Sequence, residues 1–184
     1  MTKEKKIKNS TIDQKEHDKF FKMAEEWWDP NGKFKTLHKF NPVRIAFIRE
    51  KIINHFKINP SNENPFNKIK LLDVGCGGGL LCEPMSKLGA DVTGVDIVEK
   101  NIKTASAHAK DNKLPIKYLV NTVEELATKK QKYDVILNME VIEHVSDVSL
   151  FIESCSHLLS KNGIMIFASL NRTFISYGLA IIGV

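Results

Sequence analysis

The chain has 184 residues and a net charge of +5, a length that suits one domain with a complete core. Its apolar and charged fractions are those of an ordinary globular protein, and no apolar run reaches the length of a membrane span. The basic excess is small and is not interleaved with aromatic residues, so nucleic acid is not an expected partner. The three cysteines show neither metal nor disulfide spacing and indicate a reducing, cytoplasmic setting; they are Cys76, Cys82 and Cys155.

The first part of the chain predicts a basic tail followed by a helical extension. Residues 1–10 are rich in lysine, lack an apolar core and predict a disordered tail. Residues 11–68 predict the extension, whose first helix covers Thr11 to Trp28 with aromatic residues at helical spacing. Two interpretations of Trp27 and Trp28 stay open. They pack against the next helix, or they form a lid that keeps water from a ligand.

A second helix is expected after a linker over residues 33–40. Asn41 would be its N-cap and Pro42 its first helical residue. Arg44 lies in the first turn, where a charged side chain is usually solvated. A polar loop over residues 57–68 then separates this helix from the rest of the chain.

The central feature is an apolar run that ends in an acid and a glycine-dense turn. Residues 69–74 predict a buried strand, Gly75 to Gly79 the turn, and residues 80–88 the following helix. The next strand, over residues 90–96, ends at Asp96, and an acid in that position can accept the ribose hydroxyls of a nucleoside. Together these elements predict a nucleoside-binding half-domain.

The glycine pattern distinguishes among nucleoside ligands. A dinucleotide turn has the spacing G-x-G-x-x-G, but Leu80 occupies the position of the last glycine. Asp73 precedes the turn, and its carboxylate would repel a pyrophosphate but suits a cation such as S-adenosylmethionine. The pattern therefore favours a methyltransferase over a nicotinamide dehydrogenase, and over a turn that only packs a helix on the sheet.

Strands and helices continue to alternate after Asp96. Strands are predicted over residues 115–120, 133–139 and 164–170. Helices are expected over 98–112, after Thr122 as an N-cap, and over 149–159, the last closed by a turn at 161–163. This alternation predicts an α/β fold over residues 69–170, with a mostly parallel sheet and helices on both faces. Residues 171–184 form an apolar segment at which the sequence stops, so we expect C-terminal strands to be missing.

Several motifs together resemble one family. Asp73 to Gly79 with Asp96 is similar to the class I S-adenosylmethionine-dependent methyltransferases, which have a Rossmann-like fold. The further motifs resemble the ubiquinone-biosynthesis O-methyltransferase family; they are Trp27-Trp28-Asp29, Lys35-Thr36-Leu37-His38, Asn41-Pro42-Val43-Arg44, Glu140-Val141-Ile142-Glu143-His144-Val145 and Leu170-Asn171-Arg172. The resemblance covers nearly the whole chain. It implies O-methylation of polyprenylated catechols, namely a 2-polyprenyl-6-hydroxyphenol and 3-demethylubiquinol.

The resemblance also implies which residues hold the cofactor. Arg44 would reach S-adenosylmethionine, where a guanidinium suits the methionyl carboxylate. Gly75 would line the methionine part, and Asp96 would take the ribose hydroxyls. Met139 would contact the cofactor from the end of its strand, although a methionine there also serves as core filling.

The family resemblance further implies a magnesium site at Glu140, Glu143 and His144. Carboxylate oxygens suit Mg²⁺, although the spacing alone is a weak signal, because Glu-x-x-Glu-His on an exposed turn is commonly only polar surface. The alternative active role is His144 as a general base without metal.

A polyprenyl substrate implies partners beyond the cofactor. We expect a peripheral contact with the inner face of the membrane, and contacts with other ubiquinone-biosynthesis proteins. Phe174 to Val184 would supply an apolar interfacial segment, or would pack against parts of the fold that this chain lacks. A second hypothesis is a truncated protein that binds S-adenosylmethionine without turnover.

Overall fold

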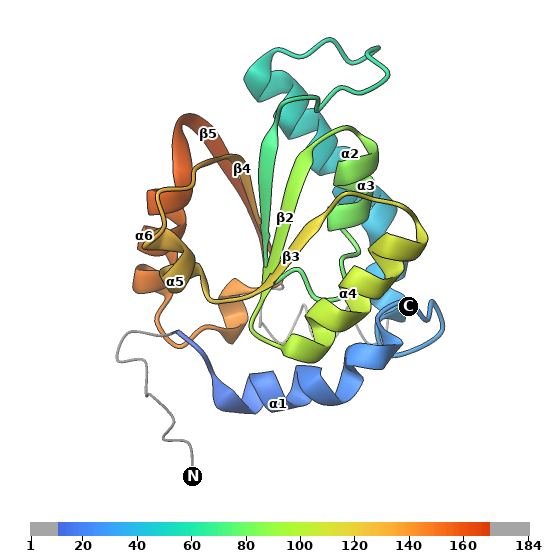
Figure 1. The fold of residues 1–184 in the computed structure, drawn as a ribbon, viewed down its shortest axis with the longest axis vertical. Helices are drawn as coiled ribbons and strands as arrows, with labels where there is room; N and C mark the ends of the chain where they lie inside the picture. The colour runs from blue at the N-terminus through green and yellow to red at the C-terminus, as the bar shows by residue number, and fades with distance from the viewer. Residues whose placement is uncertain (1–10, 170–184) are drawn as a thin grey trace, which may run out of the picture.

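The computed structural model describes residues 11–169, which form one α/β unit around a five-stranded sheet (Figure 1). The strands pair in the order β3-β2-β1-β4-β5, and every pairing is parallel. Their bounds are β1 Lys70–Val74, β2 Asp91–Asp96, β3 Lys117–Val120, β4 Tyr133–Met139 and β5 Leu159–Ala168. The predicted parallel Rossmann-like sheet is therefore confirmed, with β1 at its centre between β2 and β4.

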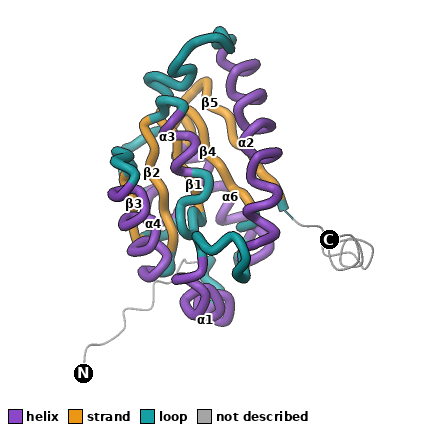
Figure 2. The backbone as a smooth tube through the Cα atoms, turned by 90° about the vertical axis from the view of Figure 1, so that its right-hand side faces the viewer, coloured by secondary structure: helices purple, strands orange, loops and turns teal. Residues whose placement is uncertain are grey.

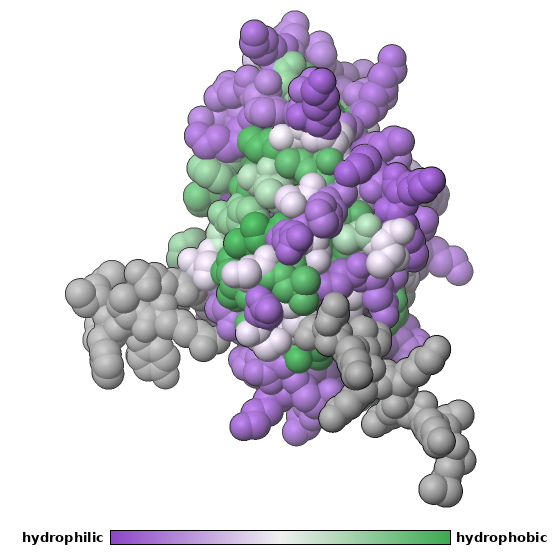
Figure 3. All heavy atoms as spheres, turned by 90° about the vertical axis from the view of Figure 1, so that its left-hand side faces the viewer, coloured by the Kyte–Doolittle hydropathy of each residue, from purple (hydrophilic) through white to green (hydrophobic). Residues whose placement is uncertain are grey.

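Helices cover both faces of this sheet, as predicted. One face carries α2 Lys35–Phe56, α3 Cys82–Lys87 and α4 Glu99–Asp111 (Figure 2), and the other carries α5 Val123–Ala127 and α6 Val148–Leu158. Successive strand residues point to opposite faces, so Leu71 joins the first core and Leu72 the second. Figure 3 looks onto the side of the molecule with α5, α6 and β5, where hydrophobic residues gather at the surface.

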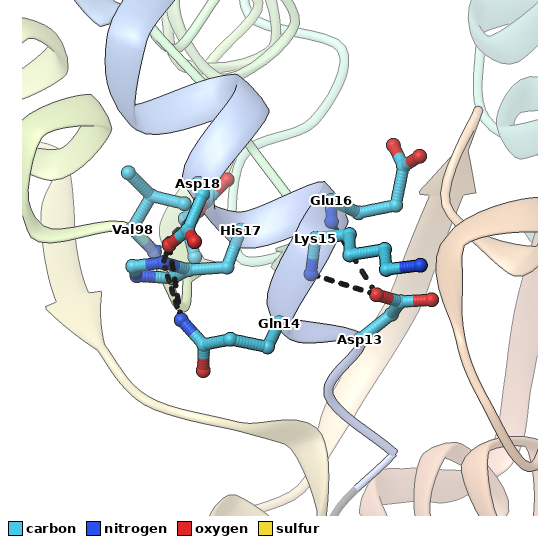
Figure 4. Close-up of polar contacts among 8 residues, drawn as sticks. Asp13, Gln14, Lys15, Glu16, His17, Asp18 and Val98 are labelled. Carbon is cyan, nitrogen blue, oxygen red and sulfur yellow. Dashed lines mark hydrogen bonds and ion pairs between the residues drawn. The ribbon is translucent and has the colours of Figure 1, made fainter.

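The expected first helix is shorter than its apolar pattern. Helix α1 covers Gln14–Met23, and a 3-10 turn over Ala24–Glu26 follows it, so the helix does not continue to Trp28. Asp13 caps α1, because its carboxylate accepts the backbone N–H groups of Lys15 and Glu16 (Figure 4).

The segment before α1 is tied to two distant parts of the chain. Ile12 bridges Val145, and Thr11 Oγ1 donates to Glu124 Oε1 at 2.7 Å. These contacts hold α1 across the carboxyl ends of the strands, at the bottom of Figure 1.

The second helix differs from its prediction. Helix α2 begins at Lys35, so residues 33–40 are not a linker, Asn41 is not an N-cap, and Pro42 lies inside the helix. Proline costs the helix one backbone hydrogen bond. The Asn41 side chain is instead used in a tertiary contact, because Nδ2 donates to the Leu80 carbonyl oxygen at 2.9 Å.

The end of the last helix was also predicted wrongly. Helix α6 ends at Leu158 and β5 starts at the next residue, so residues 161–163 belong to the strand and form no helix-closing turn. By contrast, Thr122 caps α5 as expected, with Oγ1 accepting the Glu125 N–H at 3.1 Å.

Some expectations fall outside the described range. The tail over residues 1–10, the apolar segment over 171–184 and the motif that begins at Leu170 lie there. The boundary of the methyltransferase domain at residue 69 stays a prediction. Within residues 11–169, no helix is long and apolar enough to cross a membrane.

Candidate functional site

A cavity of about 300 Å³ lies where the carboxyl ends of β1, β2 and β4 meet. Ligands of open α/β sheets bind at this edge. All the predicted site residues line it: Arg44, Gly75, Asp96, Met139, Glu140, Glu143 and His144. Residues of α1 close the cavity from outside, among them Glu16, His17 and Phe20.

The glycine turn needs its glycines for two separate reasons. Gly75, Gly77 and Gly79 have φ angles of +66°, +53° and +88°, in the left-handed region that side chains disfavour. A Cβ on Gly77 or Gly78 would overlap the side chain of Trp27. The turn is therefore a tight loop with an indole packed directly against its backbone.

The two tryptophans have different surroundings. Trp27 is buried, stacks on Phe34 with ring centroids 3.7 Å apart, and lines the cavity. Trp28 donates its indole N–H to the Gly78 carbonyl oxygen at 2.9 Å. Trp27 thus packs on the glycine turn and on Phe34 at the start of α2, as the first interpretation expects. Trp27 also lines the cavity while Trp28 does not, and a lid that keeps water from a ligand stays a prediction.

Asp96 is the most strongly bonded acid of the site. Its Oδ2 accepts the Gly77 N–H at 2.9 Å, and its Oδ1 accepts the Val98 N–H at 2.8 Å and the Asn101 amide at 3.3 Å. Burial raises the pKa of Asp96, and these hydrogen bonds oppose that shift. Each carboxylate oxygen can accept more than one bond, so a vicinal diol could still bind here.

Asp73, at the end of β1, is a buried carboxyl in a mostly apolar setting. Burial raises its pKa to about 6, while the Cys82 thiol, which donates to Oδ2 at 3.2 Å, and the positive charge of Arg44 lower it. The acid therefore lies inside the cavity wall with one cationic side chain in its field. A ligand cation placed here would favour the ionised form of Asp73.

Arg44 is held towards the cavity by its own helix. Its Nη2 donates to Asn41 Oδ1 at 3.0 Å, while its shielded Nε has no hydrogen-bond partner. Burial lowers the pKa of Arg44, and the charges of Asp73 and Glu140 raise it. A part-buried guanidinium with an unused donor at a cavity is suited to binding an anionic group such as a carboxylate.

The loop after β4 forms the next part of the wall. Met139 is buried at the last position of β4, and Glu140 follows with a φ of +60°. Strained backbone of this kind is costly, and it tends to occur at functional sites. Val141 packs closely on Gly75: a Cβ on Gly75 would lie 2.6 Å from Val141 Cγ2.

His144 lies between this loop and α1. Its Nδ1 is 2.9 Å from Glu16 Oε2, an ion-pair distance, although the atom makes no hydrogen bond of good geometry. The imidazole also meets the Phe20 ring edge-on, with centroids 5.3 Å apart. Glu143 accepts a hydrogen bond from Ser169 Oγ at 3.1 Å.

These contacts bear on the expected magnesium site. Glu140, Glu143 and His144 line one cavity, but no three His, Cys, Asp or Glu side chains of residues 11–169 are grouped so that they could hold a metal ion. As they lie, the three side chains do not fit a metal ion. The magnesium site stays a prediction, which methyl transfer before and after chelation would test.

Two site residues were missed by sequence reasoning. Asn101 lies on the buried face of α4, where its amide joins the Trp27 indole, at 2.8 Å, to Asp96. An asparagine among the apolar positions of an amphipathic helix was the available signal. Glu16 gave no signal, because its role depends on the bridge that places α1 beside His144.

The donor and acceptor groups fit S-adenosylmethionine. Asp96 offers acceptors for ribose hydroxyls, Asp73 offers a negative field for the sulfonium or ammonium group, and Arg44 offers free donors for the carboxylate. Gly75 lines the cavity and presents its backbone there without a side chain. The site thus suits a ligand with a diol, a cation and a carboxylate.

Comparisons with known proteins support this assignment. A family model described as a methyltransferase domain matches residues 72–167. The structure is similar to magnesium protoporphyrin IX methyltransferase from Synechocystis with bound SAH, with a TM-score of 0.67 and 20% identity over 90% of this chain and 73% of that one. The plantazolicin methyltransferase in complex with SAH matches at 25% identity and a TM-score of 0.57, over 90% of this chain and 64% of that one. The chain therefore has the fold of S-adenosylmethionine-dependent methyltransferases.

Curated relatives are much more similar in sequence. The ubiquinone biosynthesis O-methyltransferase of Pelagibacter ubique is 59% identical over 174 residues, which cover 95% of this chain and 72% of the relative. That of Bartonella tribocorum is 53% identical over 95% of this chain and 70% of its own length. With this identity over this coverage, the chain belongs to the ubiquinone biosynthesis O-methyltransferase family.

Proposed function

We propose that the chain transfers a methyl group from S-adenosylmethionine to a hydroxyl of a polyprenylated catechol in ubiquinone biosynthesis. One observation carries the proposal: a single cavity joins the acids and the arginine that suit the cofactor to a histidine that suits a phenol. The names of relatives more than 50% identical support O-methyl transfer in ubiquinone biosynthesis, and the polyprenylated catechol is the substrate class that the family resemblance implies.

Bound S-adenosylmethionine would supply an electrophilic methyl group on a sulfonium. The chain holds and orients the reactants, and alignment of this kind supplies much of the rate. Trp27 and Phe20 line the cavity and reduce the access of water. Met139 and the Glu140 loop fix the wall from which the methyl group would face the phenol.

His144 is the group we propose as the general base. A phenol ionises near a pKa of about 10, so at neutral pH its oxygen needs an acceptor for the proton. With Nδ1 facing Glu16, the other ring nitrogen is left to take the proton from the substrate hydroxyl. The nearby Glu16 carboxylate would stabilise the imidazolium that forms.

The test is a methyl-transfer assay on the whole chain with a short-prenyl catechol, combined with calorimetric binding of S-adenosylhomocysteine. Turnover of the catechol, with no turnover of the dimethoxy analogue that lacks a free hydroxyl, is the expected result. Binding without turnover would instead support a truncated S-adenosylmethionine-binding protein. His144→Gln should lower kcat by about 10²–10⁴-fold and leave S-adenosylhomocysteine affinity unchanged.

The proposed substrate also implies where in the cell the protein acts. A polyprenyl tail partitions into the bilayer, so we also propose that the protein acts in the cytoplasm at the inner surface of the membrane. The exposed apolar side chains of α2 support this second proposal: Phe40, Val43 and Phe47.

A further inference from the structure

Trp28 is held by a set of contacts that lies outside the cavity. Its indole stacks on the His108 imidazole, with centroids 3.5 Å apart and the planes inclined by 9°. On the far side of the imidazole, His108 Nδ1 lies 2.6 Å from Glu83 Oε1. These three side chains form what we call the Trp28 stack. None of them lines the cavity, and the proposed reaction uses none of them directly.

The base of the stack is buried. The Glu83 side chain is 2% exposed, and a carboxylate in such a place is costly without a polar partner. His108 is the partner that the structure provides, and the Asn112 side-chain amide lies 3.2 Å from Nδ1 of its imidazole. The imidazole plane, and with it the indole plane, is therefore fixed by α3 and α4.

Trp28, at the other end of the stack, is hydrogen-bonded to the glycine turn. The Trp28 indole N–H donates to the Gly78 carbonyl oxygen at 2.9 Å, and the Glu83 backbone N–H donates to that of Gly79 at 3.1 Å. One residue before Gly78, the Gly77 N–H donates to Asp96. A shift of the turn would therefore move the acid that faces the ribose.

We propose that Trp28, fixed by His108 and Glu83, is a positioning residue that sets the affinity for S-adenosylmethionine through the glycine turn. The inference rests on the proposed function, since it assumes the cofactor site described above. The turn depends on such a restraint because three of its glycines adopt positive φ, and glycine loses the most backbone freedom on folding. Removing the restraint lets the turn sample other conformations, which weakens binding without altering the reacting groups.

The test compares cofactor affinity with turnover, because a residue that positions the glycine turn should change KM and Kd for the cofactor and leave kcat unchanged. Trp28→Phe keeps an aromatic ring on His108 but leaves the Gly78 carbonyl oxygen without its donor. We expect the KM for S-adenosylmethionine and the Kd for S-adenosylhomocysteine to rise about three- to tenfold, the range for one lost hydrogen bond. At saturating cofactor, kcat should stay near that of the wild type.

His108→Ala should raise the same two constants, while Glu83→Gln, which keeps the length and a hydrogen bond to His108, should retain most of the wild-type affinity. Leu158→Val is the matched control: it loosens the opposite core face, far from the turn, and should lower the melting temperature without changing KM. If Trp28→Phe lowers kcat and melting temperature but leaves KM and Kd unchanged, Trp28 is structural and the inference is wrong. If the wild type itself does not bind S-adenosylhomocysteine, the proposed function fails instead.

Discussion

Folding and ligand binding favour different protonation states of the Asp73 carboxyl. It is buried at the end of β1, where a strand residue is normally apolar, and burial raises its pKa from the ordinary value of 3.8 to about 6. The fold therefore favours the protonated form, while a cationic ligand favours the ionised one. A site residue of this kind lowers stability in exchange for affinity.

Asp73→Asn should make the empty protein more stable at neutral pH. Because the folded pKa of Asp73 lies above the unfolded one, its stabilising contribution is full below pH 3.8 and is lost as the pH rises through about 6. The advantage of the variant in unfolding free energy should grow by roughly 2 kcal/mol between pH 4.5 and 7.5. Urea unfolding at several pH values measures it, and an advantage independent of pH would contradict the assignment. The variant should bind S-adenosylmethionine more weakly.

Asp96→Ala should weaken S-adenosylhomocysteine binding. A charge-assisted hydrogen bond to the ribose is worth roughly 1.5–3 kcal/mol, or about 10–100-fold in Kd. Calorimetry measures the change, after circular dichroism has confirmed that the variant folds. Asp91→Ala is the control, because Asp91 is an exposed acid at the other end of the same strand. Unchanged affinity in a folded Asp96→Ala protein would remove the ribose assignment.

At the scale of elements, the sequence predicted the strands well and the helix ends poorly. The apolar run of β4 and the acid at the end of β2 are local signals, and both elements end where the pattern ends. The start of α2, by contrast, does not follow from local sequence signals. Asn41-Pro42 is typical of a helix start, but the Leu80 carbonyl oxygen, 39 positions away, takes the Asn41 amide. Long-range contacts of this kind leave no trace in a single sequence.

The site shows the same division. Asp96 and Met139 lie at strand ends that local patterns mark, whereas Arg44 lies inside α2 and was predicted from the family resemblance; all three line the cavity. The role of Glu16 depends on the contact of α1 with the loop after β4, and the Trp28 stack depends on contacts of Trp28 with α3 and α4, so sequence spacing could not reveal either. A residue whose place in the site follows from the strand topology can be predicted from the sequence. A residue whose place depends on packing between distant elements cannot.

Asn41→Ala should disturb α2 and the site together. It removes the bond to the Leu80 carbonyl oxygen and the bond that holds Arg44 Nη2. We expect a loss of about 1–3 kcal/mol in unfolding free energy and weaker S-adenosylhomocysteine binding. Asn54→Ala, at an exposed position of the same helix, should have neither effect. Weaker stability with unchanged affinity would show that Asn41 does not position Arg44.

At the scale of the whole molecule, the exposed apolar side chains of residues 11–169 include two groups. One belongs to α6 and the edge strand β5, on the side of the molecule that Figure 3 faces, and consists of Val148, Ile152 and Phe167. The other is a stripe on α2, formed by Phe40, Val43 and Phe47 at spacings of three and four residues. Contiguous exposed apolar side chains mark sites of contact with membranes or partners.

The α2 stripe is the better candidate for a membrane surface, because its own helix is basic. Lys39 is exposed next to Phe40, and Lys51 Nζ lies 5.1 Å from the centre of the Phe47 ring. Leu37 and Arg44 of the same helix line the cavity, so a bilayer on this face would lie beside the active site. An apolar stripe flanked by lysines binds best to anionic lipid.

We therefore expect the chain to co-sediment with anionic vesicles, more weakly at high salt, and hardly at all with neutral ones. The double variant Val43→Asp/Phe47→Asp should stay in the supernatant, because it places two charges in the stripe. Ile152→Asp, which adds a charge to the other apolar area, should sediment like the wild type. A chain ending at Arg172 tests the contribution of residues 173–184 separately. If the double variant sediments as fully as the wild type at moderate salt, α2 is not the membrane contact, and loss of binding only on truncation would place that contact in the C-terminal segment.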